Sequence, residues 1–122
     1  MRSRTVLVIE DEAVVALFLT DVLEEMNCQV CAVAPSGRAA LDLAAKHRPD
    51  LAMVDVRLKG DLDGVETALQ LHNRFGIRSV LLSGDPEALQ TAQSRGVEPI
   101  AVLTKPYTPE QVRKILNQAF SG

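Results

Sequence analysis

Apolar runs of strand length recur along the chain, and each is followed by a segment whose apolar residues repeat at helical spacing. The runs lie near residues 5–9, 29–33, 51–55, 79–83 and 100–104. Their alternation with helices predicts five β-α units and a parallel sheet. Because the runs are almost continuously apolar, we expect helices to cover both faces of that sheet. The pattern therefore predicts an open α/β sandwich.

Residue pairs typical of helix starts support this division. Each pair joins a capping side chain to a neighbouring proline: Pro35-Ser36, Asp85-Pro86 and Thr108-Pro109. Thr108 and Gln111 also have the spacing of a capping box, in which two side chains satisfy backbone amides reciprocally. We therefore expect helices to begin near these three positions.

Length and composition favour one globular domain, which we expect to span residues 1–122. The net charge of −3 is small, and Lys and Arg are scattered, so we do not expect direct binding to nucleic acid. The first apolar run is too short for a signal-peptide core or a membrane span. We expect a cytoplasmic protein without a membrane partner.

Cys28 and Cys31 have the spacing of some metal and redox sites, but the chain has no second cysteine pair. On a strand, residues three apart face opposite sides of the sheet. We therefore interpret both cysteines as structural thiols within the core.

Polar side chains stand where the predicted strands end. They are Glu10 and Asp11 after the first run, Asp55 at the end of the third, Ser83 at the end of the fourth and Lys105 after the fifth. In parallel α/β sheets the ligand site lies at the carboxyl ends of the strands. We expect these five residues to form one site.

Their chemistry fits phosphoryl transfer. Crowded carboxylates repel one another, and a hard cation with oxygen ligands, such as Mg²⁺, relieves that repulsion. A carboxylate can also be the nucleophile that accepts a phosphoryl group, and Asp55 is the best placed. Lys105 and Ser83 could each contact a phosphoryl oxygen, while Gly84 leaves the approach open.

Taken together, Glu10-Asp11, Asp55, Ser83-Gly84 and Lys105-Pro106 on five β-α units resemble the receiver domain of two-component response regulators over essentially the whole chain. The resemblance implies a flavodoxin-like (βα)5 doubly wound fold with a five-stranded parallel sheet of order 2-1-3-4-5. It implies that Asp55 is the phosphoacceptor.

The same resemblance implies the roles of the surrounding groups. Glu10, Asp11, Asp55 and the backbone carbonyl of Arg57 would bind Mg²⁺, with Asp11 the more direct ligand and Glu10 acting through water. Ser83 and Lys105 would contact the phosphoryl group. The Lys105-Pro106 bond would be cis, a form whose energy cost is small before proline.

The implied function is a phosphorylation-dependent signalling switch in a phosphorelay. The phosphoryl donor would be a histidine kinase or a histidine phosphotransfer protein. A downstream protein partner would contact residues 86–120. Apart from its own phosphorylation and dephosphorylation, the domain would not act as an enzyme.

The sequence departs from the family pattern at Val102, where many receivers carry Tyr or Phe as an aromatic switch. Tyr107, directly after Pro106, could take that role or could simply pack at the domain edge. We also hypothesise that Arg57 pairs with Asp85 across the mouth of the site, although Asp85 suits a helix N-cap equally well.

The loop after Asp55 appears one residue longer than usual and lacks a common proline. It contains Asp61 and Asp63, which suit a polar loop and a helix start better than a metal site.

Two other functions use a similar fold. An Mg²⁺-dependent aspartate-nucleophile phosphatase or related hydrolase commonly needs a second acid two residues after the nucleophile, where this sequence has Arg57. A flavodoxin-like nucleotide binder needs a glycine-rich loop after the first strand, where Glu10, Asp11 and Glu12 would repel phosphate.

Overall fold

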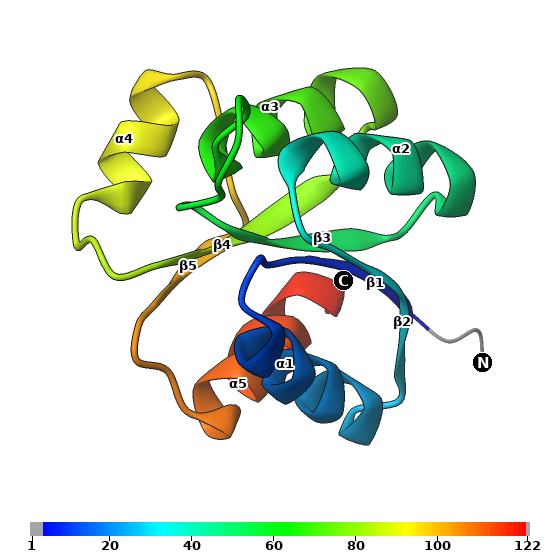
Figure 1. Cartoon of the computed structure of the whole chain (residues 1–122). Helices are drawn as coiled ribbons and strands as arrows, with labels where there is room; N and C mark the ends of the chain where they lie inside the picture. The colour runs from blue at the N-terminus through cyan, green and yellow to red at the C-terminus, as the bar shows by residue number, and fades with distance from the viewer. Residues whose placement is uncertain (1–3, 122) are drawn as a thin grey trace.

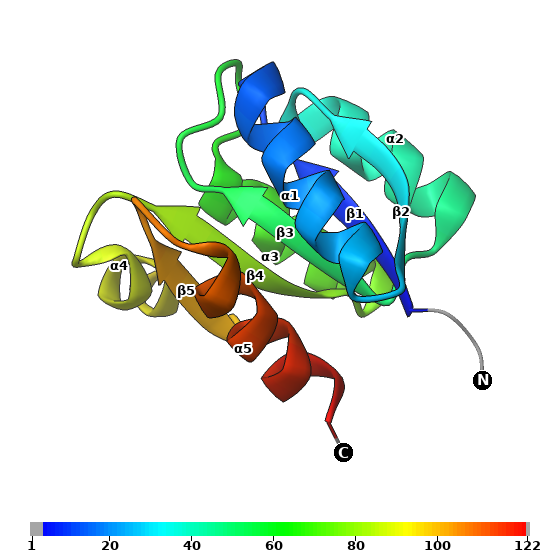
Figure 2. The same cartoon turned by 90° about the horizontal axis from the view of Figure 1, so that it is seen from below.

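Five parallel strands form one sheet in the computed structural model, which describes residues 4–121 (Figure 1). The strands are β1 (Arg4–Ile9), β2 (Cys28–Ala34), β3 (Leu51–Asp55), β4 (Arg78–Ser83) and β5 (Ala101–Thr104). They are arranged in the order β2-β1-β3-β4-β5 and all run in the same direction (Figure 2). Both the predicted strands and the predicted strand order are confirmed.

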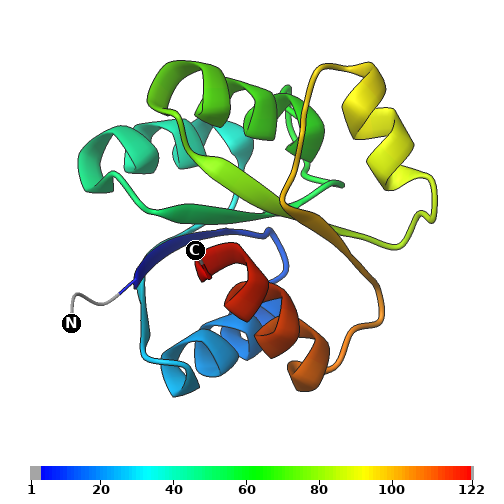
Figure 3. The same cartoon turned by 180° about the vertical axis from the view of Figure 1, so that it is seen from behind.

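Helices cover both faces of this sheet. They are α1 (Ala13–Glu25), α2 (Gly37–His47), α3 (Gly64–Phe75), α4 (Ala88–Ser94) and α5 (Pro109–Phe120). One face is covered by α1 and α5, and the other by α2, α3 and α4 (Figures 1 and 3). The expected doubly wound α/β sandwich is therefore confirmed.

The strands place alternate side chains in two separate cores. On β1, Leu7 and Ile9 belong to the core beneath α2, α3 and α4, whereas Val6 and Val8 belong to the core beneath α1 and α5. All four side chains are completely buried. Since both faces are covered, nearly every residue of such a strand is apolar, which explains the continuous runs in the sequence.

Helix capping follows the expected residues at two of three positions. Ser36 accepts a hydrogen bond from the amide of Ala39, and Thr108 with Gln111 forms the predicted capping box. The prediction for α4 is wrong by two residues. Asp85 accepts a hydrogen bond from the amide of Glu87, but a turn closed by the bond from Ala88 N to the Asp85 carbonyl precedes the helix.

The two cysteines lie on opposite sides of β2, as predicted. Cys28 belongs to the core of α1 and α5, while Cys31 packs against the other core. The register between β1 and β2 shifts near Cys31, because Val6 pairs with Val30 and the next residue of β1 pairs with Ala32. Both thiols are free, and burial raises the pKa of each.

Within residues 4–121, none of the helices has the length and the apolar composition needed to cross a membrane.

Candidate functional site

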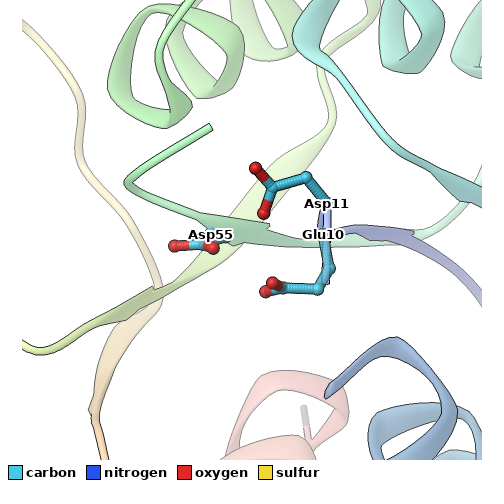
Figure 4. Close-up of side chains that lie close together, drawn as sticks. All are labelled: Glu10, Asp11 and Asp55. Carbon is cyan, nitrogen blue, oxygen red and sulfur yellow. The ribbon is translucent and has the colours of Figure 1, made fainter. Parts of the chain in front are cut away.

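Three acidic side chains meet at the carboxyl ends of β1 and β3 (Figure 4). Glu10 and Asp11 directly follow β1, and Asp55 is the last residue of β3. The two strands are neighbours, with Ile9 paired to Val54, so their ends bring the three acids together. One carboxylate oxygen from each acid lies within 4.8 Å of those from the other two. Crowding of this kind favours either protonation or a bound cation.

Burial intensifies the electrostatic conflict at Glu10. This side chain is 2% exposed, and its Oε1 accepts a hydrogen bond of 3.2 Å from the amide of Glu12. Its Oε2 is buried and has no hydrogen-bond partner among residues 4–121. Burial, followed by the negative charge of Asp55, raises the pKa of Glu10 to about 7. Glu10 therefore has one carboxylate oxygen inside the acidic cluster that accepts no hydrogen bond from the described residues.

The Asp55 carboxylate contacts a backbone amide and a lysine ammonium group. Its Oδ1 accepts a hydrogen bond of 3.0 Å from the amide of Arg57 and lies 3.3 Å from Nζ of Lys105. Lys105 follows β5, two strands away from β3, and its own amide donates to the carbonyl of Ser83. The Lys105-Pro106 bond is cis, as the resemblance implied. The lysine thus reaches back across β4 to the buried carboxylate.

Ser83 ends β4 beside this site and is 2% exposed. Its Oγ accepts a hydrogen bond of 3.0 Å from the amide of Asp85, which leaves the hydroxyl proton available for donation elsewhere. At Gly84, an added Cβ would meet no other described atom within 4 Å, so the approach is open as expected.

A cavity of about 630 Å³ opens over these groups. Asp11, Asp55 and Lys105 line it together with Arg57 and Gly84. Lys59 lines it as well, a residue that the sequence pattern did not single out because it does not follow directly on an apolar run. Three of the five predicted residues, Asp11, Asp55 and Lys105, thus line one accessible mouth, while Glu10 and Ser83 are buried next to it.

Tyr107 packs beside the acidic cluster. Its ring lies 5.9 Å from that of Phe18 on α1, and its hydroxyl is buried without a hydrogen-bond partner in the described chain. Burial, and then the charges of Glu10, Asp55 and Glu12, raises the pKa of Tyr107 to about 12. The ring packs at the domain edge, one of the two expectations for this residue. A signalling role for Tyr107 stays a hypothesis.

The hypothesised pair between Arg57 and Asp85 is not formed. None of the ion pairs found between residues 4 and 121 joins these two side chains. Arg57 is exposed, and the Asp85 carboxylate instead accepts the amide of Glu87 within its own turn. A local hydrogen bond thus directs Asp85 away from the role predicted for it.

Asp61 and Asp63, the acids of the loop after Asp55, do not belong to the cluster of Glu10, Asp11 and Asp55. Asp61 pairs with Arg38 of α2, with 2.6 Å between the charged atoms. Asp63 caps α3 by accepting the amide of Glu66, as the sequence indicated, and also pairs with Arg95. The capping role is confirmed. Both pairs with arginine join residues far apart in the sequence and were not predicted.

An apolar groove of about 460 Å³ adjoins the site. It is lined by Val14 and Phe18 of α1 and by Lys105, Pro106 and Tyr107 of the loop after β5. Val14 is 82% exposed, and Leu17 on the same helix is 63% exposed. This exposed apolar surface was not predicted. The sequence does indicate it, because α1 carries apolar residues on more of its circumference than one buried face requires.

The raised pKa of Glu10 makes stability depend on pH. The folded chain holds the Glu10 proton more tightly than the unfolded chain, whose pKa is near 4.5. The stabilisation from this proton is fully present below about pH 4.5 and is lost as the pH rises through about 7. Without divalent cations, we expect Glu10→Gln to exceed wild type in free energy of unfolding by about 1 kcal/mol or more at pH 8, and by less near pH 5.

Urea unfolding in the presence of a chelator, across this pH range, measures the difference. Glu12→Gln is the matched control, because Glu12 is an exposed neighbour whose backbone, not side chain, contacts Glu10. It should keep the pH dependence of wild type. Parallel curves for wild type and Glu10→Gln would contradict the prediction.

Comparison with known proteins identifies close similarity over most of the chain. Residues 6–117 match the family described as response regulator receiver domain. The transcriptional regulatory protein PdtaR of Mycobacterium tuberculosis is 30% identical over 105 residues, which is 86% of this chain and 51% of PdtaR. This chain therefore spans about half of that relative.

Two further comparisons cover nearly the full length of both partners. Sporulation initiation phosphotransferase F of Bacillus subtilis is 25% identical over 114 residues, or 93% of this chain and 90% of that protein. The signal receiver domain of a modulated diguanylate cyclase from Desulfovibrio desulfuricans G20 has a TM-score of 0.86 at 32% identity, covering 97% of this chain and 94% of that one. The structural similarity and the sequence similarity therefore point to the same family.

Proposed function

Because this chain belongs to the response regulator receiver family, we propose that it is a signalling switch controlled by phosphorylation of Asp55. The observation that carries this proposal is the environment of Asp55. This buried carboxylate ends β3, lies 3.3 Å from the Lys105 ammonium group, and opens to solvent through a cavity large enough for a phosphoryl group.

In the proposed reaction, a carboxylate oxygen of Asp55 attacks phosphorus while the bond from phosphorus to a donor histidine nitrogen breaks. The phosphoryl group passes to Asp55, and the electron pair of the broken bond stays on the donor nitrogen. Lys105 offsets negative charge on the transferred group, and the Ser83 hydroxyl donates to one of its oxygens. Gly84 keeps the approach open.

The donor set fits Mg²⁺. Receivers typically bind this ion, and the cluster of Glu10, Asp11 and Asp55 supplies only oxygen ligands, which hard cations prefer. The buried, unpartnered Oε2 of Glu10 supports the fit, because a bound water or ion would satisfy it. The backbone carbonyl of Arg57 is the fourth proposed ligand. When bound, the ion would supply positive charge next to the phosphoryl oxygens.

We propose a histidine kinase or a histidine phosphotransfer protein as the donor, with the apolar groove beside α1 as its contact. Lys105 lines both the groove and the cavity over Asp55, so a protein seated on Val14 and Phe18 would place its histidine near the site. The relative from Bacillus subtilis, a phosphotransferase by name, supports onward phosphorelay. The downstream partner would bind residues 86–120, and these events would take place in the cytoplasm.

The groove makes a selective prediction. Replacing exposed apolar anchors with alanine weakens protein contacts but leaves small-molecule chemistry intact. Val14 lines the groove, and Leu17 is an exposed apolar residue one turn further along α1, outside the groove lining. Val14→Ala with Leu17→Ala should slow transfer from a phosphorylated histidine phosphotransfer protein roughly tenfold. Labelling by a small acyl phosphate should stay within about twofold of wild type. Rapid-quench assays with each donor measure both rates.

Leu89→Ala is the matched control, because Leu89 is also an exposed apolar residue but lies on α4. This variant should transfer from both donors at the wild-type rate. An equal loss with the two donors, or no loss with the protein donor, would refute the docking surface.

A hydrolase that uses Asp55 as its nucleophile is not favoured. The residue two positions after Asp55 is Arg57 rather than a second acid, and the matching family consists of receivers. Incubation with excess acyl phosphate and, separately, with a generic phosphate ester distinguishes the two functions. A switch should take up one phosphoryl group per chain and should not turn over the ester, whereas many turnovers of the ester would establish a hydrolase instead.

A further inference from the structure

An arginine at the end of α4 forms an ion pair with the loop that follows Asp55. Arg95 is the C-cap of α4, and Asp63 is the last residue of the loop formed by residues 56–63. Arg95 Nη1 donates to Asp63 Oδ2 at 3.0 Å, and Nη2 donates to Oδ1 at 3.2 Å. The Arg95 side chain is 39% exposed and the Asp63 side chain is 47% exposed, so both remain in contact with solvent. This two-point geometry is more specific than a single contact between charges.

Asp63 is in turn connected rigidly to the backbone of Asp55. Its Oδ1 caps α3 by accepting the amide of Glu66 at 2.8 Å, and the amide of the next residue, Gly64, donates to the carbonyl of Val56. A Cβ added at Gly64 would overlap the carbonyl oxygen of Asp55. A shift of the backbone after Asp55 must therefore displace the start of α3 and, with it, Asp63.

The helix at the other end of this connection is weakly held. Helix α4 has seven residues, and its buried side chains are the small ones of Ala88 and Ala92. Its N-cap residue, Glu87, makes no capping hydrogen bond with its side chain. The helix lies at the β5 end of its layer (Figure 3). A short helix with little buried surface moves at low cost, so one anchor at its C-terminal end has a large influence.

The position that carries an aromatic switch in many receivers cannot provide this connection here. Val102 is a small, partly buried side chain that packs against the core beneath α2, α3 and α4. It has neither a ring nor a polar group that could exchange partners between two arrangements.

We propose that the Arg95–Asp63 pair carries the phosphorylation state of Asp55 to α4, in place of an aromatic side chain at position 102. This inference rests on the proposed function for the signal itself. In the unphosphorylated chain the Arg57 amide donates to Asp55 Oδ1. Phosphorylation of Asp55 rearranges the loop of residues 56–63, to which Arg57 belongs, and Arg95 transmits the change to the C-terminal end of α4. The N-terminal end is reached separately, through the bond from the Asp85 amide to Ser83.

The chain contains a matched control on the same loop. The Arg38–Asp61 pair also joins an arginine to an aspartate of residues 56–63, but it leads to α2 instead of α4. Arg38→Ala therefore removes an equivalent charge and contact without touching α4. Asp63→Asn removes the charge of Asp63 but keeps an oxygen that can cap α3.

The first arm of the test needs no phosphorylation. In hydrogen–deuterium exchange of the unphosphorylated chain, Arg95→Ala should speed exchange of the α4 amides by about two- to fivefold, the range for loss of a partly exposed ion pair. Arg38→Ala should leave α4 at the wild-type rate. Asp63→Asn should resemble Arg95→Ala, and the double variant should exchange no faster than either single one. Unchanged α4 exchange in Arg95→Ala would overturn the link.

The second arm compares each chain before and after labelling with acyl phosphate and Mg²⁺. The change in α4 exchange seen in wild type should fall by at least about half in Arg95→Ala, at the same phosphoryl stoichiometry, and should persist in Arg38→Ala. An equal change in wild type and Arg95→Ala would refute the inference, as would an equal loss in both arginine variants. Failure of wild type to take up phosphate would refute the proposed function, while the first arm would still test the link.

Discussion

Removal of Mg²⁺ is expected to slow the labelling of Asp55 by acyl phosphate at least about 100-fold, because the site would lose its largest positive charge. Without the ion, the approaching phosphoryl group meets three acids whose carboxylate oxygens lie within 4.8 Å of one another, and the nearest cation to Asp55 is the ammonium group of Lys105. Repulsion between these acids and the phosphoryl oxygens then opposes transfer. Mass spectrometry over time, in chelator and in excess Mg²⁺, gives the two rates.

A matched pair of variants links this effect to the acidic cluster. Asp11→Ala should lose most of the rate enhancement by Mg²⁺, since it removes one of the three proposed acidic ligands. Asp21→Ala removes an exposed acid of α1 outside the cluster and should respond to Mg²⁺ like wild type. If wild type were labelled at rates within about threefold of each other with and without Mg²⁺, the cluster would not be a metal site that supports labelling.

Replacement of Lys105 by methionine is the second change with a large expected effect. The variant keeps an unbranched apolar stem but removes the ammonium group 3.3 Å from Asp55 Oδ1. Loss of one positioned donor at the transferred group should slow labelling roughly 100-fold. It should also lower the free energy of unfolding by about 1–3 kcal/mol without Mg²⁺, because the buried carboxylates lose a neighbouring cation.

The stability effect has an internal check. A divalent cation offsets the same negative charge, so the stability difference between wild type and Lys105→Met should shrink when Mg²⁺ is added. Lys114→Met, at an exposed position of α5, should behave like wild type in both assays. If Lys105→Met labelled at the wild-type rate and unfolded at the wild-type urea concentration, Lys105 would have no role at the site.

Strand positions were predictable because burial on both faces leaves an uninterrupted apolar run. The run ending at Asp55 matches β3 at both ends, and the run ending at Ser83 matches β4 to within one residue. Once parallel strands are inferred, their carboxyl ends must share one edge of the sheet. The local pattern therefore places Glu10, Asp11 and Asp55 at one edge of the sheet, and the strand order implied by the resemblance makes β1 and β3 neighbours there.

Contacts between distant segments were not predictable in the same way. Arg95 and Asp63 are 32 residues apart, and their pairing depends on where α4 ends relative to α3. The proposed pair of Arg57 and Asp85 failed for the complementary reason, since a local turn satisfied Asp85 first. Side-chain partners on the surface are chosen by tertiary geometry that hydrophobic periodicity does not encode.

The surface of α1 was predictable in part. The segment after the first apolar run was correctly predicted to be a helix that covers the sheet, and Leu19 and Val22 are buried there. Predicting that Val14 and Leu17 are exposed requires a further step, which is to ask whether one helix face can hold all of the apolar residues. An excess of them indicates a surface available to a partner.

The most direct measurement is the intact mass of the chain after incubation with a small acyl phosphate and Mg²⁺, for wild type and Asp55→Ala in parallel. Asp42→Ala serves as the control, because it removes an exposed aspartate of α2. Wild type and the control should each gain the mass of one phosphoryl group, and Asp55→Ala should gain none. The central claim would be contradicted if wild type gained no phosphoryl mass, or if Asp55→Ala gained as much as wild type.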